Sequence, residues 1–155
     1  MTSPIPPVSA ADSTGPLLLY DGTCGFCARS VQWVLEHEGP RRTLRFARLE
    51  GPIGRALIAR RPELRAIDSV VWYEPAGAGR AERALTRSAA ALEAARYIGG
   101  VWAMLAAPGR LVPRVVRDAA YDFVARHRHR IVGRELCVIP TAEQRVRFVD
   151  LDAPC

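Results

Sequence analysis

Lysine is absent from this chain. All 22 basic side chains are arginines, and they outnumber the 16 acidic side chains, so the formal net charge is +6. An excess of this size permits contact with an anionic surface but does not define a function by itself. Because acidic residues are interspersed through most of the chain, the sequence favours a solvated surface over a binding stripe, and nucleic acid is not an expected partner.

Long apolar runs are missing as well. No segment approaches the roughly 18 consecutive apolar residues of a membrane-spanning helix. Residues 1–16 contain four prolines and no basic residue, so they lack the charged and apolar regions of a secretory signal and are expected to form a disordered tail. These absences predict a cytoplasmic protein, in which a close cysteine pair is used catalytically more often than as a structural disulfide.

The rest of the chain has the composition of an ordinary globular domain. Of its 155 residues, 49 % are hydrophobic and 25 % are charged, which suits one domain with a real core. We expect that domain to span residues 17–140, with a helical extension from about residue 99. Residues 141–155 are expected to form a tail.

Residues 17–27 predict a strand, a tight turn and the start of a helix. Residues 17–20 are apolar or aromatic throughout, as in a strand that is covered on both faces. Asp21 and Gly22 are typical of a turn, and the hydroxyl of Thr23 can cap a helix by accepting a hydrogen bond from its first amides.

This pattern places two cysteines at the beginning of the helix. Cys24 falls at or near the helix N-terminus, and Cys27 lies one turn further along the same face. The positive end of the helix dipole lowers the pKa of a cysteine from about 8.5 towards roughly 3.5–7.5. We therefore expect Cys24 to attack a substrate disulfide and Cys27 to resolve the mixed disulfide, which leaves a Cys24–Cys27 bond.

Two other interpretations of the cysteine pair remain open. The pair could be half of a zinc site completed by Cys137 and a histidine, although zinc ligands commonly come as two close pairs. It could also be structurally inert. Cys155 is the last residue and is expected in the tail.

Two motifs resemble those of one known family. Residues 20–27 read YDGTCGFC, and residues 121–140 contain VARHRHR, then GR, then CVIP. The first resembles the Asp-x-x-Cys-x-x-Cys signature of the DCC family of thiol-disulfide oxidoreductases, and the second resembles that family's carboxy-terminal signature. One departure is Ser88-Ala89-Ala90, where many members carry Ser-Asp-Ala, so any role of that acid is absent here.

The resemblance implies an α/β, thioredoxin-like three-layer fold with a small central sheet. The apolar patterns agree with it, since they predict further strands over residues 42–49, 69–73 and 80–85 and helices over 24–38, 53–61 and 86–98. In thioredoxins a cis-proline precedes the strand that corresponds to residues 69–73. Residues 67–69 stand there in this chain and contain no proline, which argues against a conventional thioredoxin.

The expected helical extension is rich in apolar residues. Residues 101–107 are apolar nearly all round, which predicts a buried arm of a helical hairpin; contact with a membrane or partner is the alternative. Pro113 can open the last long helix. One apolar stripe runs along that helix, formed by Val116, Ala119, Ala120, Phe123 and Val124.

Arg126, Arg128 and Arg130 alternate with histidines at the end of that helix. Cations complement the negative pole of a helix, so a solvated cap is the simplest interpretation. Transient contact with an anionic surface and a His-x-His metal pair are the alternatives.

Several residues near the cysteines are candidates for the site. Asp21 could act as a general base or acid for a cysteine, or could simply form the turn. Tyr20, Thr23 and Cys137 are possible auxiliary residues, although a free cysteine is often a small buried hydrophobe.

The sequence therefore predicts a thiol-disulfide oxidoreductase that acts on protein or small-molecule disulfides through Cys24 and Cys27, with Asp21 in its site. No nicotinamide or flavin fingerprint is present, so we expect no cofactor and no metal, and electrons from another thiol system. The alternative is a zinc-stabilised, non-enzymatic interaction domain.

Overall fold

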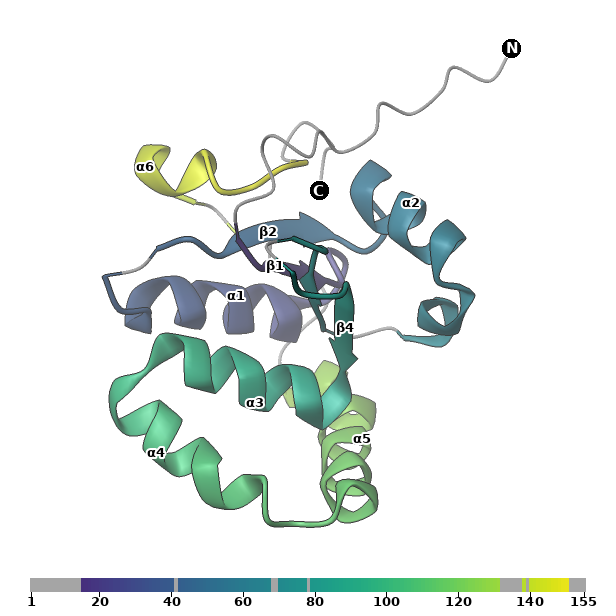
Figure 1. The fold of residues 1–155 in the computed structure, drawn as a ribbon, viewed down its shortest axis with the longest axis vertical. Helices are drawn as coiled ribbons and strands as arrows, with labels where there is room; N and C mark the ends of the chain where they lie inside the picture. Colours follow the sequence, from purple (N-terminus) through teal and green to yellow (C-terminus); the bar gives the residue numbers. More distant parts are fainter. Residues whose placement is uncertain are drawn as a thin grey trace.

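A mixed sheet of four strands forms the centre of the molecule (Figure 1). The computed structural model describes residues 15–40, 42–67, 70–77, 79–131, 138 and 140–150. The strands are β1 (Leu17–Tyr20), β2 (Arg45–Arg48), β3 (Val71–Glu74) and β4 (Arg83–Thr86), in the order β2-β1-β3-β4. Strand β1 is parallel to β2 and antiparallel to β3, which in turn is antiparallel to β4.

Helices cover both faces of the sheet (Figure 1). Helices α1 (Gly25–His37) and α3 (Arg87–Ile98) pack on one face, and α2 (Pro52–Arg60) and the 3₁₀ helix η2 (Pro62–Ala66) pack on the other. Beyond α3, the chain continues as α4 (Gly100–Gly109), a loop over residues 110–113 and α5 (Arg114–Ile131). We call this helix–loop–helix segment the α4–α5 hairpin; each of its helices packs mainly against α3. Helix α6 (Ala142–Arg145) is a single short turn. Gly99 follows α3 and Gly100 begins α4, with φ values of 82° and 54°, in the left-handed region that favours glycine.

Side chains of β1 alternate between the two faces. Leu18 and Tyr20 belong to the core cluster under α1 and α3, whereas Leu17 and Leu19 belong to the cluster under α2. All four are buried, which explains the uninterrupted apolar run in the sequence. The architecture confirms the predicted α/β class and is consistent with a thioredoxin-like fold that carries a helical extension.

Some predictions concern residues that the structure does not describe. These are the tail over residues 1–14, the auxiliary role of Cys137, the placement of Cys155, and two of the three residues before β3, Asp68 and Ser69.

Helix α4 differs from the buried arm that the sequence predicts. Met104 is 75 % exposed, and Val101 and Leu105 are exposed too, whereas Ala106 is buried. Helix α4 packs against α3 with one side. An apolar pattern on all sides leads to burial only where neighbours cover every side, and here they do not.

Helix α5 carries the predicted apolar stripe on its outer face. Every residue of that stripe is exposed. The inner face, which packs against α3 and α1, is polar instead. On it Asp118 accepts a hydrogen bond from the hydroxyl of Ser88 and lies 3.4 Å from Arg114, while Asp122 lies 3.6 Å from Arg87.

Residues 141–150 pack against the domain, which corrects the predicted tail over its described part. Phe148 is buried, forms a parallel bridge with Phe46 of β2 and stacks on its ring with 5.0 Å between centroids. The carboxylate of Asp150 accepts a hydrogen bond from the backbone N–H of Arg48 at 2.8 Å. The apolar residues of this segment, Val146, Phe148 and Val149, form a run too short to predict such packing from its pattern.

We expect Phe148→Ala to lower the free energy of unfolding by about 3–5 kcal/mol, because it removes a buried ring from the core. Val146→Ala is the matched control, since Val146 lies two residues away and is 83 % exposed. Urea unfolding followed by circular dichroism would measure both. Equal stability of the two variants would mean that residues 141–150 do not belong to the cooperative fold.

Candidate functional site

The two cysteines lie where β1 leads into α1, as the sequence predicts. Cys24 is the N-cap residue of α1 and Cys27 lies in its first turn. The backbone carbonyl of Cys24 accepts a hydrogen bond from the N–H of Ala28 at 3.0 Å. Both thiols are free and fully buried, with 0 % of Cys24 and 1 % of Cys27 exposed. A disulfide substrate therefore cannot reach either sulfur without local movement.

Asp21 organises the turn before the cysteines. Its Oδ1 accepts two hydrogen bonds from Thr23, one from the backbone N–H at 2.9 Å and one from the hydroxyl at 2.7 Å. The Thr23 side chain is thus a donor to Asp21, and Cys24 rather than Thr23 occupies the N-cap position. This corrects the predicted capping role of Thr23, because the helix begins one residue later than a cap at Thr23 requires.

Arg128 of α5 brings a positive charge to the cysteines. Only 3 % of this residue is exposed. Its Nη2 lies 3.3 Å from Oδ2 of Asp21, and its Nη1 donates to Sγ of Cys27 across 4.0 Å. Asp21, Cys27 and Arg128 therefore form one buried charged cluster, which we call the arginine cluster.

The arginine cluster corrects the grouping of Arg126, Arg128 and Arg130 as surface cations. Arg126 and Arg130 are exposed, but Arg128 points into the molecule. Helical geometry accounts for the difference, since residues four apart share a face and the residue midway between them lies on the opposite side. The sequence carried this signal, but nothing in it showed which face would turn inward.

The surroundings of Cys27 favour its protonated form. Burial raises the pKa of the Cys27 thiol to about 12, and the charge of Cys24, a hydrogen bond with the Cys24 side chain and the carboxylate of Asp21 act in the same direction. The guanidinium of Arg128 opposes them and favours the thiolate. Burial is the largest of these influences, so Cys27 is held as a thiol.

Tyr20 lies at the end of β1 and is buried. Burial raises the pKa of its phenol to about 12, with smaller increases from the carboxylates of Asp150 and Glu50 and a decrease from Arg48. Its charged neighbours thus come from β2 and the C-terminal segment. An auxiliary role in exchange stays a prediction for Tyr20, as it does for Thr23.

The zinc alternative finds no support among the described residues. They contain no group of three or more histidine, cysteine, aspartate or glutamate side chains that could hold a metal ion. Cys137, which the alternative needs, lies outside them.

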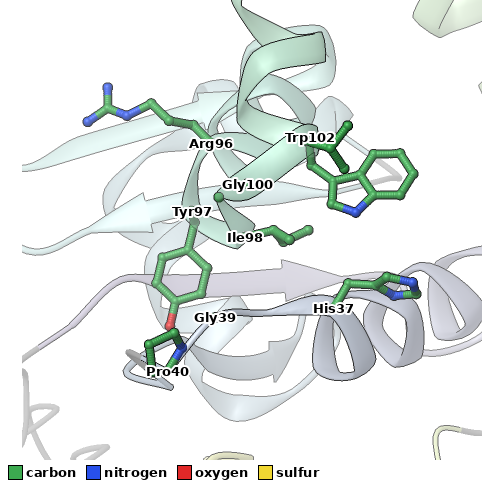
Figure 2. A pocket seen from close by; sticks show the side chains of 10 residues that line it. His37, Gly39, Pro40, Arg96, Tyr97, Ile98, Gly100 and Trp102 are labelled. Carbon is green, nitrogen blue, oxygen red and sulfur yellow. The ribbon is translucent and has the colours of Figure 1, made fainter.

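A surface hollow of about 550 Å³ lies at the other end of α1 (Figure 2). His37, Pro40, Tyr97 and Trp102 are among the residues that line it. The hydroxyl of Tyr97 accepts hydrogen bonds from the backbone N–H groups of Thr43 and Leu44. Since α1 is about 20 Å long, this hollow is separate from the cysteines, and its lining contains no thiol.

These observations define a domain of thioredoxin-like architecture with a Cys-x-x-Cys dithiol at the start of its first helix. The chain belongs to the DCC1-like thiol-disulfide oxidoreductase family, which it matches over residues 18–134. Membership confirms the resemblance noted in the sequence, and the family name associates the chain with redox chemistry of thiols.

Two relatives illustrate the family. The chain is 29 % identical to the uncharacterized protein YuxK of Bacillus subtilis (strain 168), over 86 % of this chain and 93 % of YuxK. It is 33 % identical to the DCC family protein At1g52590, chloroplastic, of Arabidopsis thaliana, over 77 % of this chain and 66 % of the plant protein. No solved structure matches the chain. In the described part of the chain, no helix is long and apolar enough to cross a membrane.

The raised pKa values of Cys27 and Tyr20 predict that the reduced protein loses stability as the pH rises above about 9. In the unfolded chain these groups lose their protons near 9.0 and 10.0, whereas in the folded protein they keep them up to about 12. The native state then binds more protons, so the free energy of unfolding falls by up to about 1.4 kcal/mol per pH unit for each group.

Urea unfolding of the reduced protein between about pH 8 and pH 11 would measure this slope. Cys27→Ser should show a shallower slope, because serine does not titrate in this range and only the contribution of Tyr20 remains. Identical slopes for the two proteins would contradict the burial-raised pKa of Cys27.

Proposed function

We propose that this protein is a thiol-disulfide oxidoreductase that exchanges disulfides through Cys24 and Cys27. The observation that supports it most is the unequal setting of the two thiols. Cys24 occupies a helix N-terminus, where the backbone favours negative charge, and Cys27 is buried as a protonated thiol one turn away. The sulfur of Cys24 is thus suited to attack a disulfide, and the sulfur of Cys27 stays protonated until the second step.

In the proposed cycle the Cys24 thiolate attacks one sulfur of a substrate disulfide. A bond forms between Cys24 and that sulfur, and the other substrate sulfur leaves as a thiolate that takes up a proton. Cys27 then loses its proton and attacks the Cys24 sulfur, which forms the Cys24–Cys27 disulfide and releases the second substrate thiol. The substrate gains two electrons, and a second thiol pair reduces the protein again. Run backwards, the same steps oxidise a dithiol.

Formation of the mixed disulfide would itself prepare Cys27 for its step. Once Cys24 is bonded to substrate it is neutral, so its charge and its hydrogen bond no longer raise the pKa of Cys27. The guanidinium of Arg128, which lies 4.0 Å from Sγ of Cys27 in the reduced protein, would continue to favour the thiolate. Arg128 thus acts through Cys27 as a positioning and electrostatic residue.

The expected substrates are disulfides of proteins or low-molecular-weight thiols in a reducing compartment such as the cytoplasm. Because both sulfurs are buried, exchange begins with a local opening that exposes Cys24. No metal or bound cofactor takes part in this proposal.

We expect Cys24→Ser to abolish the reduction of insulin disulfides by the protein in the presence of dithiothreitol. Cys27→Ser should instead accumulate a mixed disulfide on Cys24, because the resolving thiol is missing. Mass spectrometry of acid-quenched reactions would identify the trapped adduct. Normal turnover by Cys24→Ser would refute the proposal, as would stoichiometric zinc in protein purified without chelator whose removal unfolds the domain.

Substitutions in the arginine cluster should shift the pH profile of the resolving step in opposite directions. Arg128→Gln removes the charge that lowers the pKa of Cys27, so resolution should need a higher pH. Asp21→Asn removes a charge that raises this pKa, so resolution should proceed at a lower pH. Rapid-quench measurement of adduct decay against pH would follow both changes.

Arg126→Gln is the matched control, since Arg126 is exposed on the same helix. Arg128→Lys keeps the positive charge, so the pH profile of its resolving step should lie between those of Arg128→Gln and the unaltered protein. Removing one partner of a buried ion pair also destabilises the fold, by about 3 kcal/mol. A loss of stability without any shift of the pH profile would limit Arg128 to a structural role, and slower resolution by Asp21→Asn at every pH would instead favour Asp21 as a general base.

A further inference from the structure

Exposed apolar side chains are concentrated on the α4–α5 hairpin. Nine of the ten exposed large hydrophobic residues in the described part of the chain lie between residues 101 and 124. We call these nine the hairpin surface; they are Val101, Met104, Leu105, Leu111, Val112, Val115, Val116, Phe123 and Val124. The hairpin forms one end of the long axis of the molecule (Figure 1). Apolar patches of this kind mark sites of interaction with a protein or a membrane.

Specific contacts on the inner face of α5 fix its orientation and keep its apolar side exposed. Polar and ionic contacts hold the helix to the body through Asp118, Asp122 and Arg128. The loop before α5 is fixed in the same way, since Arg110 lies 3.5 Å from the buried carboxylate of Glu93. The hairpin therefore keeps its apolar side outward through specific contacts.

The charge of the hairpin restricts what can cover it. Residues 100–131 contain six arginines and two aspartates. Two of the four surplus positive charges are matched by carboxylates outside this segment, Arg110 by Glu93 and Arg128 by Asp21, which leaves a surplus of two. Both aspartates are engaged with groups of the protein itself, Asp118 with Ser88 and Arg114, and Asp122 with Arg87. Exposed arginines flank the hairpin surface, with Arg110 in the loop before α5, Arg114 at its first position, and Arg126 and Arg130 near its end.

We propose that the hairpin surface binds the headgroup region of an anionic lipid membrane. Apolar side chains enter the boundary between headgroups and acyl chains, and the exposed Arg126 and Arg130 bind lipid phosphates. Helix α5, about 27 Å long, lies along the membrane surface. A second copy of the chain fits less well, because a symmetric dimer would bring two surfaces of the same positive charge together. The proposal is independent of the redox chemistry.

Co-sedimentation of the full chain with sucrose-loaded vesicles tests this. We expect binding to phosphatidylcholine vesicles in which about a third of the lipid is phosphatidylglycerol, weak binding to pure phosphatidylcholine, and a loss of binding as salt is raised. The double variant Met104→Ser/Leu105→Ser should weaken binding by at least about tenfold, because it removes the apolar contribution of two exposed residues. Val146→Ser, exposed but outside the hairpin, should bind like the unaltered protein.

The charge contribution is tested separately. Arg126→Gln/Arg130→Gln should weaken binding to anionic vesicles by about tenfold, whereas the equally exposed pair Arg29→Gln/Arg65→Gln should change it less. Far-ultraviolet circular dichroism would verify that every variant is folded. Equal binding to neutral and anionic vesicles, or no binding to either, would overturn the proposal. So would a dimer in light scattering that Met104→Ser/Leu105→Ser dissociates, because a second copy would then cover the hairpin surface.

Discussion

The ion pair between Asp21 and Arg128 holds the candidate site together. It joins the turn after β1 to a helix 107 residues further along the chain, and both partners are largely buried, with 17 % and 4 % of their side chains exposed. A buried guanidinium without its carboxylate would be costly, so each group requires the other. The helical extension is therefore part of the site, because α5 supplies the charge beside Cys27.

The same cluster makes the two cysteines chemically unequal. Cys24 is the N-cap residue of α1, and its backbone carbonyl accepts a hydrogen bond from the N–H of Ala28. Cys27 is one turn deeper, between the sulfur of Cys24, the guanidinium of Arg128 and the carboxylate of Asp21. Position along one helix, together with one contact from α5, gives the two sulfurs different surroundings.

The sequence predicted what local patterns control. Strand β1, helix α1 and the place of Cys24 follow from apolar runs and turn residues within a dozen positions. The sequence-based prediction missed two contacts of Asp21. One is with Arg128, which lies 107 residues away along the chain, and the other is with the hydroxyl of Thr23, which donates to its carboxylate. The stripe of α5 was visible too, but periodicity shows which residues share a face and not which face turns inward.

The inverted orientation of α5 has a consequence for sequence variation among relatives. In an ordinary surface helix the apolar positions face the core and tolerate few substitutions, whereas the polar positions face solvent and vary among relatives. Here folding alone would tolerate polar residues at Val116 or Phe123, which are exposed, and would reject most changes at Asp118 or Arg128, which contact the body of the protein. Apolar residues retained at the outer positions across the family would then record selection by whatever binds there, separately from selection for a stable fold.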